Sequence, residues 1–156
     1  MFFPEPTLAG AGLSPHAMTF AMSSPASIPS ATVRTTGRKW RILYAEDVRE
    51  LREVARMALS LDGHTIECAL DGQLALARVT ADPAAFDLII TDHHMPNMNG
   101  LELVENLRRI KFPGKIIVFS SELKQQIHDA YLAFNVDRVL PKPIFPSELR
   151  KVLAEM

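Results

Sequence analysis

Five polar residues that could do chemistry each follow a short apolar run of the chain: Glu46, Asp47, Asp92, Ser120 and Lys142. Three carboxylates brought together would repel one another unless a cation neutralised their charge. Carboxylate oxygens favour a hard ion, and Mg²⁺ commonly binds one or two carboxylates while keeping its waters. A lysine and a hydroxyl beside such an ion suit a phosphoryl group, because phosphoryl transfer depends on positioning and charge neutralisation. Aspartate is a known phosphoryl acceptor, so the set could hold a phosphoryl group on one carboxylate.

The hydrophobic pattern predicts elements that would bring these residues together. Continuous apolar runs predict strands at residues 41–45, 65–70, 87–91, 115–119 and 137–140. Apolar residues three and four apart predict helices at residues 48–61, 71–80, 100–110, 123–134 and 147–155. This alternation predicts an α/β fold, in which five helices cover both faces of a five-stranded parallel sheet. The active crevice of such sheets lies at the carboxyl ends of the strands, where all five polar residues fall.

Smaller features give further expectations. In the first helix, the apolar residues at helical spacing are Leu51, Val54, Ala55, Ala58 and Leu59. Asp71 is placed to cap the second helix. Cys68 lies in an apolar run and is expected to be a buried core thiol, and Trp40 is expected to pack at the sheet edge.

The composition divides the chain near Gly37. Before it, Pro, Ser, Thr, Ala and Gly dominate, and only Glu5 and Arg34 are charged. Such a segment cannot bury enough apolar area to offset its ordering entropy, so residues 1–36 are expected to be a disordered extension. Residues 38–156 then form one ordinary domain, which the length of 156 residues allows.

Charge and hydropathy argue against several classes of partner. The net charge of −1 gives no basic surface for nucleic acid. No apolar stretch approaches the roughly 20 residues of a membrane-spanning helix, and the first residues lack the pattern of a secretory signal. A single cysteine cannot form an internal disulfide, which favours a reducing compartment. We therefore expect a cytoplasmic protein.

Four motifs taken together resemble a known family. They are the pair Glu46–Asp47, the run DLIITDHHMPNMNG at residues 87–100, Ser120 after KIIVF, and Lys142–Pro143. Their order and spacing resemble the receiver domain of two-component response regulators (CheY-like), over about residues 38–156. The resemblance implies a flavodoxin-like, doubly wound sheet with the strand order 2-1-3-4-5.

The resemblance also implies a role for each matching residue. Asp92 would accept a phosphoryl group from a phosphohistidine of a sensor histidine kinase. Mg²⁺ (or Mn²⁺) would be bound directly by Asp47, through water by Glu46, and by Asp92 and the backbone carbonyl of His94. Such a protein would catalyse only its own phosphorylation and autodephosphorylation.

Other matching residues would contact the phosphoryl group or shape its surroundings. Ser120 and Lys142 would each bond a phosphoryl oxygen, although Ser120 could instead only cap the following helix. His94 and Glu122 would flank the group and set its lifetime. The Lys142–Pro143 peptide is expected to be cis.

Two departures from the family pattern stand out. Val139 occupies a position where similar receivers often carry Tyr or Phe, so a swinging aromatic ring is missing there. His93 and His94 form an unusual pair that invites a transition-metal interpretation, since imidazole is a common metal ligand. Consecutive residues leaving a strand point in different directions, however, so we do not expect both to bind one ion.

The expected function is a phosphorylation-dependent switch that signals by protein contact, because no output domain follows the last helix. The output partner is unknown, and a monomer or weak dimer is expected. The contact face of the fourth helix, fifth strand and fifth helix would include Lys124, Gln125, His128, Asp137, Arg138 and Arg150.

Alternatives to this function are a relay that passes phosphate to a histidine phosphotransfer protein, and a degenerate receiver that binds without phosphorylation. The D-H-H motif at residues 92–94 also suggests a metal-dependent phosphoesterase, but the further motifs of that class are missing.

Overall fold

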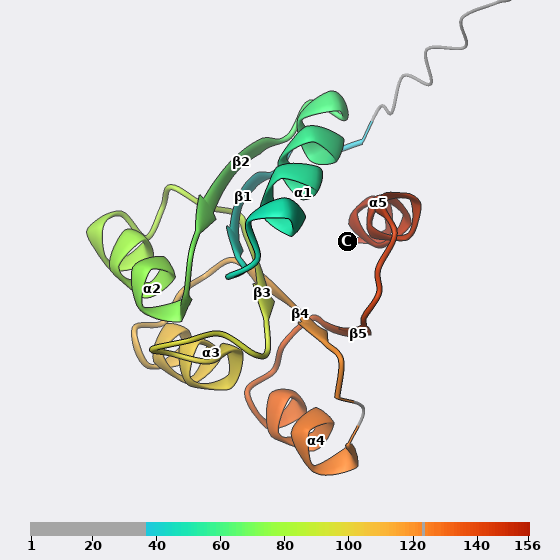
Figure 1. Ribbon diagram of the computed structural model, residues 1–156. Helices are drawn as coiled ribbons and strands as arrows, with labels where there is room; N and C mark the ends of the chain where they lie inside the picture. Colours follow the sequence, from blue (N-terminus) through green and yellow to red (C-terminus); the bar gives the residue numbers. More distant parts are fainter. Residues whose placement is uncertain (1–36, 123) are drawn as a thin grey trace, which may run out of the picture. The chain divides into compact units, whose positions relative to one another are not determined.

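The computed structural model describes residues 37–122 and 124–156, so the expected disorder of residues 1–36 lies outside the described part. Strands and helices alternate along that part (Figure 1). The strands are β1 (Arg41–Ala45), β2 (Thr65–Ala69), β3 (Leu88–Asp92), β4 (Lys115–Ser120) and β5 (Arg138–Pro141). The helices are α1 (Arg49–Leu61), α2 (Gly72–Ala81), α3 (Gly100–Arg109), α4 (Gln125–Ala133) and α5 (Pro146–Glu155). No helix of the described residues is both long and apolar enough to cross a lipid bilayer.

The strands form one sheet in the order β2-β1-β3-β4-β5, with every neighbouring pair parallel. This confirms the predicted doubly wound α/β fold and its strand order. The boundaries differ from the predicted ones by one or two residues. The difference matters at Asp92 and Ser120, which are the last residues of β3 and β4 rather than the first residues beyond them.

Helices cover both faces of the sheet, and each face has its own core (Figure 1). Residues of α2, α3 and α4 pack on one face, and residues of α1 and α5 pack on the other. Trp40 is buried in the second core, against β1, which is an inner strand between β2 and β3. The expectation that Trp40 packs at the sheet edge is therefore wrong. Cys68 packs against the same core but is only half-buried.

Helix α1 buries less of its apolar face than its sequence predicts. Leu59 is fully buried, whereas Leu51 is 42% exposed and Val54 is 54% exposed. These exposed side chains line a groove of about 400 Å³ between α1 and the start of α5, together with Phe145 and Leu149. Helical spacing identifies which residues share a face, but the distance to the neighbouring helix decides how much of that face is covered.

Polar residues fix the loop that follows β3. Asp71 caps α2 as predicted, because its carboxylate accepts a hydrogen bond of 2.8 Å from the backbone of Leu74. Its other oxygen accepts a bond of 2.7 Å from Asn97, a residue of the β3–α3 loop with a φ of 64°. Asn99 caps α3, and Gly100 begins that helix. A Cβ on Gly100 would lie 2.3 Å from the carbonyl oxygen of Asp92, so only glycine fits this close approach.

Candidate functional site

Three carboxylates meet at the carboxyl ends of β1 and β3, as predicted. The carboxylate oxygens of Glu46, Asp47 and Asp92 lie within 4.8 Å of one another. Glu46 is 0% exposed and Asp92 is 5% exposed, whereas Asp47 is exposed to solvent. Two of the three negative groups are therefore held out of water, where they need a positive partner.

Lys142 supplies that partner from the end of β5. Its Nζ lies 3.0 Å from Oδ1 of Asp92 and 3.0 Å from Oε2 of Glu46. Burial raises the pKa of Glu46, even though the lysine and the Val48 amide oppose the shift. Burial alone would lower the pKa of Lys142, but its hydrogen bonds to Asp92 and Glu46 outweigh this effect and raise the pKa. The lysine therefore stays charged between the two carboxylates.

Glu46 is held by further hydrogen bonds. The hydroxyl of Tyr44 donates to Oε2 at 3.1 Å, and the backbone N–H of Val48 donates to Oε1 at 3.2 Å. Burial and the nearby carboxylate of Glu46 raise the pKa of Tyr44, which keeps the phenol protonated as a donor. Both oxygens of Glu46 thus have protein partners, which suits contact with an ion through water rather than directly. No sequence pattern predicts this role of Tyr44, which is expected only to be a residue of a strand.

The donor set fits a hard divalent cation. Three carboxylates and one ammonium leave an excess of negative charge at this end of the sheet. All the side-chain donors are oxygens, and Asp47 is open to solvent, as an ion that keeps several waters requires. When bound, Mg²⁺ would neutralise this charge beside Asp92.

Ser120 lies next to Asp92 but its hydroxyl is turned toward its own loop. In the register of β3 and β4, Asp92 pairs with Phe119, so Ser120 is one residue further along the neighbouring strand. Its Oγ donates to the carbonyl oxygen of Glu122 at 2.9 Å and accepts from the Glu122 N–H at 3.1 Å. Ser120 does not cap α4, whose N-cap is Lys124. A contact with a group on Asp92 would require the Ser120 hydroxyl to leave Glu122.

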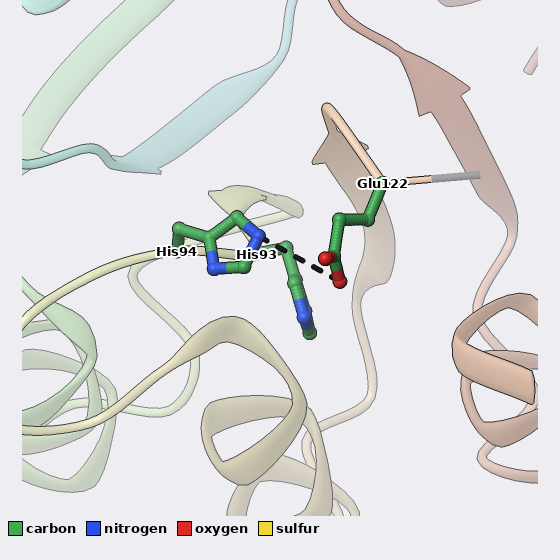
Figure 2. Close-up of side chains that lie close together, drawn as sticks. All are labelled: His93, His94 and Glu122. Atoms are coloured by element: carbon green, nitrogen blue, oxygen red, sulfur yellow. Dashed lines mark ion pairs between the residues drawn. The ribbon is translucent and has the colours of Figure 1, made fainter. Parts of the chain in front are cut away.

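The two histidines after Asp92 lie closer together than expected. Their ring centroids are 4.6 Å apart at an angle of 71°. Because β3 ends at Asp92, the strand alternation that would separate His93 and His94 stops before them. Nε2 of His94 lies 3.9 Å from Oε2 of Glu122, on the opposite loop (Figure 2).

His93 connects this loop to α4. Its Nδ1 shares a hydrogen bond of 2.6 Å with the hydroxyl of Tyr131, which is fully buried. Burial and the neighbouring His94 lower the pKa of His93, which favours the neutral ring. From the sequence, Tyr131 is only one of the apolar positions of a helix, so its contact with the site could not be predicted.

The remaining predictions concern the end of β5 and the partner face. The Lys142–Pro143 peptide is cis, as predicted. Two of the residues expected on the partner face form ion pairs with residues of other helices or strands. Asp137 pairs with Lys115 at 3.0 Å, and Arg150 forms an ion pair with Asp62 at the end of α1.

Comparison with known proteins agrees with this fold. The family model of the response regulator receiver domain matches residues 42–154. The chain is 35% identical over 143 residues to the sensor histidine kinase AruS of Pseudomonas aeruginosa, an alignment that covers 89% of this chain and 14% of AruS. It is 32% identical over 117 residues to the two-component response regulator ORR41 of Oryza sativa subsp. japonica, covering 74% of this chain and 92% of ORR41.

Solved structures agree as well. The chemotaxis protein CheY4 of Vibrio cholerae superposes with a TM-score of 0.68 at 28% identity, covering 76% of this chain and 98% of CheY4. The chain spans less than half the length of the first curated relatives it matches. The matched region runs from the second residue of β1 to the last but one residue of α5, and it includes all the residues of the acidic cluster. The chain therefore belongs to the response regulator receiver domain family of two-component signalling.

Proposed function

We propose that this protein is a phosphorylation-operated switch that accepts a phosphoryl group on Asp92 from a phosphohistidine of a sensor histidine kinase. The observation that carries the proposal is the position of the Lys142 ammonium, 3.0 Å from the Asp92 carboxylate, inside an otherwise acidic crevice. An ammonium there neutralises charge on the acceptor and on an incoming phosphate. In the transfer, an oxygen of Asp92 forms the new bond to phosphorus while the bond to the imidazole of the donor breaks. We assign this role to a receiver domain at residues 38–156.

The neighbouring residues would prepare Asp92 for this step. Asp47 would bind Mg²⁺ directly, Glu46 would bind it through water, and the backbone carbonyl of His94 would complete the protein ligands with Asp92. Lys142 would keep its contact with the acceptor and pair with a phosphoryl oxygen. Since the donor kinase draws its phosphate from ATP, we place the exchange in the cytoplasm.

Transmission of the signal would begin at Ser120. Its two hydrogen bonds to the backbone of Glu122 close the turn between β4 and α4. If the hydroxyl turned to bond a phosphoryl oxygen, both bonds would be lost and the turn before α4 would rearrange. Amide hydrogen exchange in α4 should therefore respond to phosphorylation, and a Ser120→Ala variant should lose most of that response.

His94 and Glu122 would set the lifetime of the phosphorylated state. His94 follows the acceptor by two residues and its side chain is 57% exposed, so it can border the group on Asp92. Exchanging either residue should change the rate of autodephosphorylation, measured as loss of label after removal of the phosphodonor. Unchanged rates in both variants would contradict this assignment.

The groove beside α1 is a suitable docking site for the phosphodonor protein. It is lined by the exposed apolar residues Leu51, Val54 and Phe145, and also by Lys142, which contacts the acceptor. A partner seated in the groove is therefore next to Asp92, and the histidine donor is the partner that must reach this residue. The output protein would bind elsewhere, at exposed residues such as Lys124, Gln125 and Arg138.

Intact mass measured after incubation with a small phosphodonor and Mg²⁺ tests the proposal. The folded protein should gain one phosphoryl group, and the Asp92→Asn variant should gain none. Asp82→Asn, which changes an exposed aspartate outside the crevice, is the matched control and should still be labelled. No gain by the unmodified protein would favour a receiver that binds partners without phosphorylation, and a gain by Asp92→Asn would place the acceptor elsewhere. Transfer of label from Asp92 to a histidine phosphotransfer protein would favour the relay role instead.

A further inference from the structure

We propose that His93, His94 and Glu122 form a binding site for a divalent transition-metal ion of the Zn²⁺ class, separate from the acidic cluster. The three residues come from two loops, β3–α3 and β4–α4, at the carboxyl edge of the sheet (Figure 2). The proposed receiver function uses the acidic cluster and places His94 and Glu122 beside the phosphoryl group. It gives no reason for the second imidazole, that of His93, which lies next to them.

The geometry brings the three ligand groups within reach of one ion. One ligand atom from each residue lies within 4.8 Å of the others, and the His94–Glu122 pair is already at 3.9 Å. Ligand atoms about 2.0–2.1 Å from a tetrahedral Zn²⁺ lie about 3.3 Å from one another. Shifts of about an ångström would therefore close the site. The side chains of His94 and Glu122 are 57% and 34% exposed, so neither is locked by packing.

The surroundings suit metal ligation. Tyr131 holds the His93 ring through Nδ1 at 2.6 Å, and a histidine ligand usually has such an outer hydrogen bond that fixes its orientation. The two oxygens of Glu122 are divided between partners, with Oε1 at 3.2 Å from Nζ of Lys124 and Oε2 facing His94. A metal ion can take Oε2 without breaking the lysine contact.

The two sites differ in the ions they prefer. The acidic cluster offers only oxygen side-chain ligands, which suit Mg²⁺. Two imidazoles and one carboxylate suit Zn²⁺, Cu²⁺ or Ni²⁺, because imidazole nitrogen binds these ions far better than it binds Mg²⁺. Excess Mg²⁺ should consequently fill the acidic cluster and leave the histidine site free. Binding at the histidine site does not depend on phosphorylation of Asp92 and can be measured on the unmodified protein.

Zinc titration against a chromophoric zinc indicator, in excess Mg²⁺, tests the inference. We expect one zinc ion per chain, with the affinity reduced at least about tenfold in His94→Gln and in Glu122→Gln. His64→Gln and His128→Gln are matched controls, because both change histidines outside the cluster, and they should bind zinc as the unmodified protein does. Thermal unfolding of each variant in a chelator identifies any variant whose loss of binding reflects misfolding.

Two results would overturn the inference. The first is zinc binding that survives both His94→Gln and Glu122→Gln in folded protein. The second is zinc binding that excess Mg²⁺ or Asp47→Asn abolishes, which would assign the ion to the acidic cluster. X-ray absorption of the zinc complex gives an independent measurement, since the imidazole signal should weaken in His94→Gln.

Discussion

Replacement of Lys142 by methionine tests the electrostatic account of the site most directly. The ammonium lies 3.0 Å from both Glu46 and Asp92, which are 0% and 5% exposed. Methionine preserves an apolar, flexible stem but removes the charge. Two buried carboxylates would then face each other without their ammonium partner.

The expected cost follows from the burial of the three groups. Removing one partner of a buried ion pair costs about 3–5 kcal/mol. The Lys142 side chain is 22% exposed, so water screens part of its interaction and the lower end of this range, about 3 kcal/mol, is expected. At about 4 °C per kcal/mol for a domain of this size, the melting temperature should fall by about 12 °C.

The pH dependence of the loss provides a second criterion. The lysine opposes the upward shift that burial imposes on the pKa of Glu46, so its removal raises that pKa further. A carboxyl group whose pKa is higher in the folded than in the unfolded state stabilises the fold below its unfolded pKa and loses that contribution as the pH rises. The destabilisation should therefore be largest near neutral pH and shrink as the pH falls toward the ordinary pKa of glutamate.

Urea unfolding in the presence of a chelator, at several pH values, measures both effects. Lys115→Met is the matched control, because Lys115 also pairs with an aspartate at 3.0 Å but the two side chains are 37% and 25% exposed. That more exposed pair should contribute less than about 1 kcal/mol. Excess Mg²⁺ should restore part of the stability lost in Lys142→Met. Equal losses in the two variants, or a loss independent of pH, would refute the reasoning.

Three further predictions concern other parts of the domain. Gly100→Ala should destabilise the fold by about 1–3 kcal/mol, because the added Cβ would lie 2.3 Å from the carbonyl oxygen of Asp92. Gly37→Ala is the control and should have little effect in the same unfolding assay, since a Cβ on Gly37 would meet no atom within 4 Å. The hydrogen bonds and ion pair with Arg41 lower the pKa of Asp87 to about 2. The contribution of Asp87 to the stability of the fold should therefore be present above the ordinary pKa of aspartate and disappear as the pH falls toward 2. Unfolding free energies of Asp87→Asn should lack this part of the acid dependence. Leu51→Glu should slow phosphorylation by a histidine kinase while leaving labelling by a small phosphodonor unchanged, and equal slowing of both would argue against docking in the groove.

The sequence was sufficient to predict the fold and the convergence of the acidic residues. Apolar runs mark the strands, and a parallel sheet brings the residues that follow its strands to one edge. Glu46, Asp92 and Lys142 could therefore be predicted to meet, although they are far apart in the chain.

Sequence patterns do not predict the distances between packed helices or the rotamers of side chains. The exposed part of α1, with Leu51 and Val54, depends on how far α5 lies from it. The ion pair of Arg150 with Asp62 depends on the same packing. The approach of the rings of His93 and His94 depends on the residue at which β3 ends.

The contact between His93 and Tyr131 bears on how a receiver with valine at position 139 can still communicate with α4. Val139 packs against the same core as Tyr131 but has no ring that could move between two positions. The hydroxyl of Tyr131 instead reaches the residue next to the acceptor, and its ring is fully buried. A buried hydrogen bond of this kind is costly to break without a replacement partner. A displacement of the β3–α3 loop would therefore also displace α4. In this protein the aromatic link between the acceptor and α4 therefore comes from α4 itself rather than from β5.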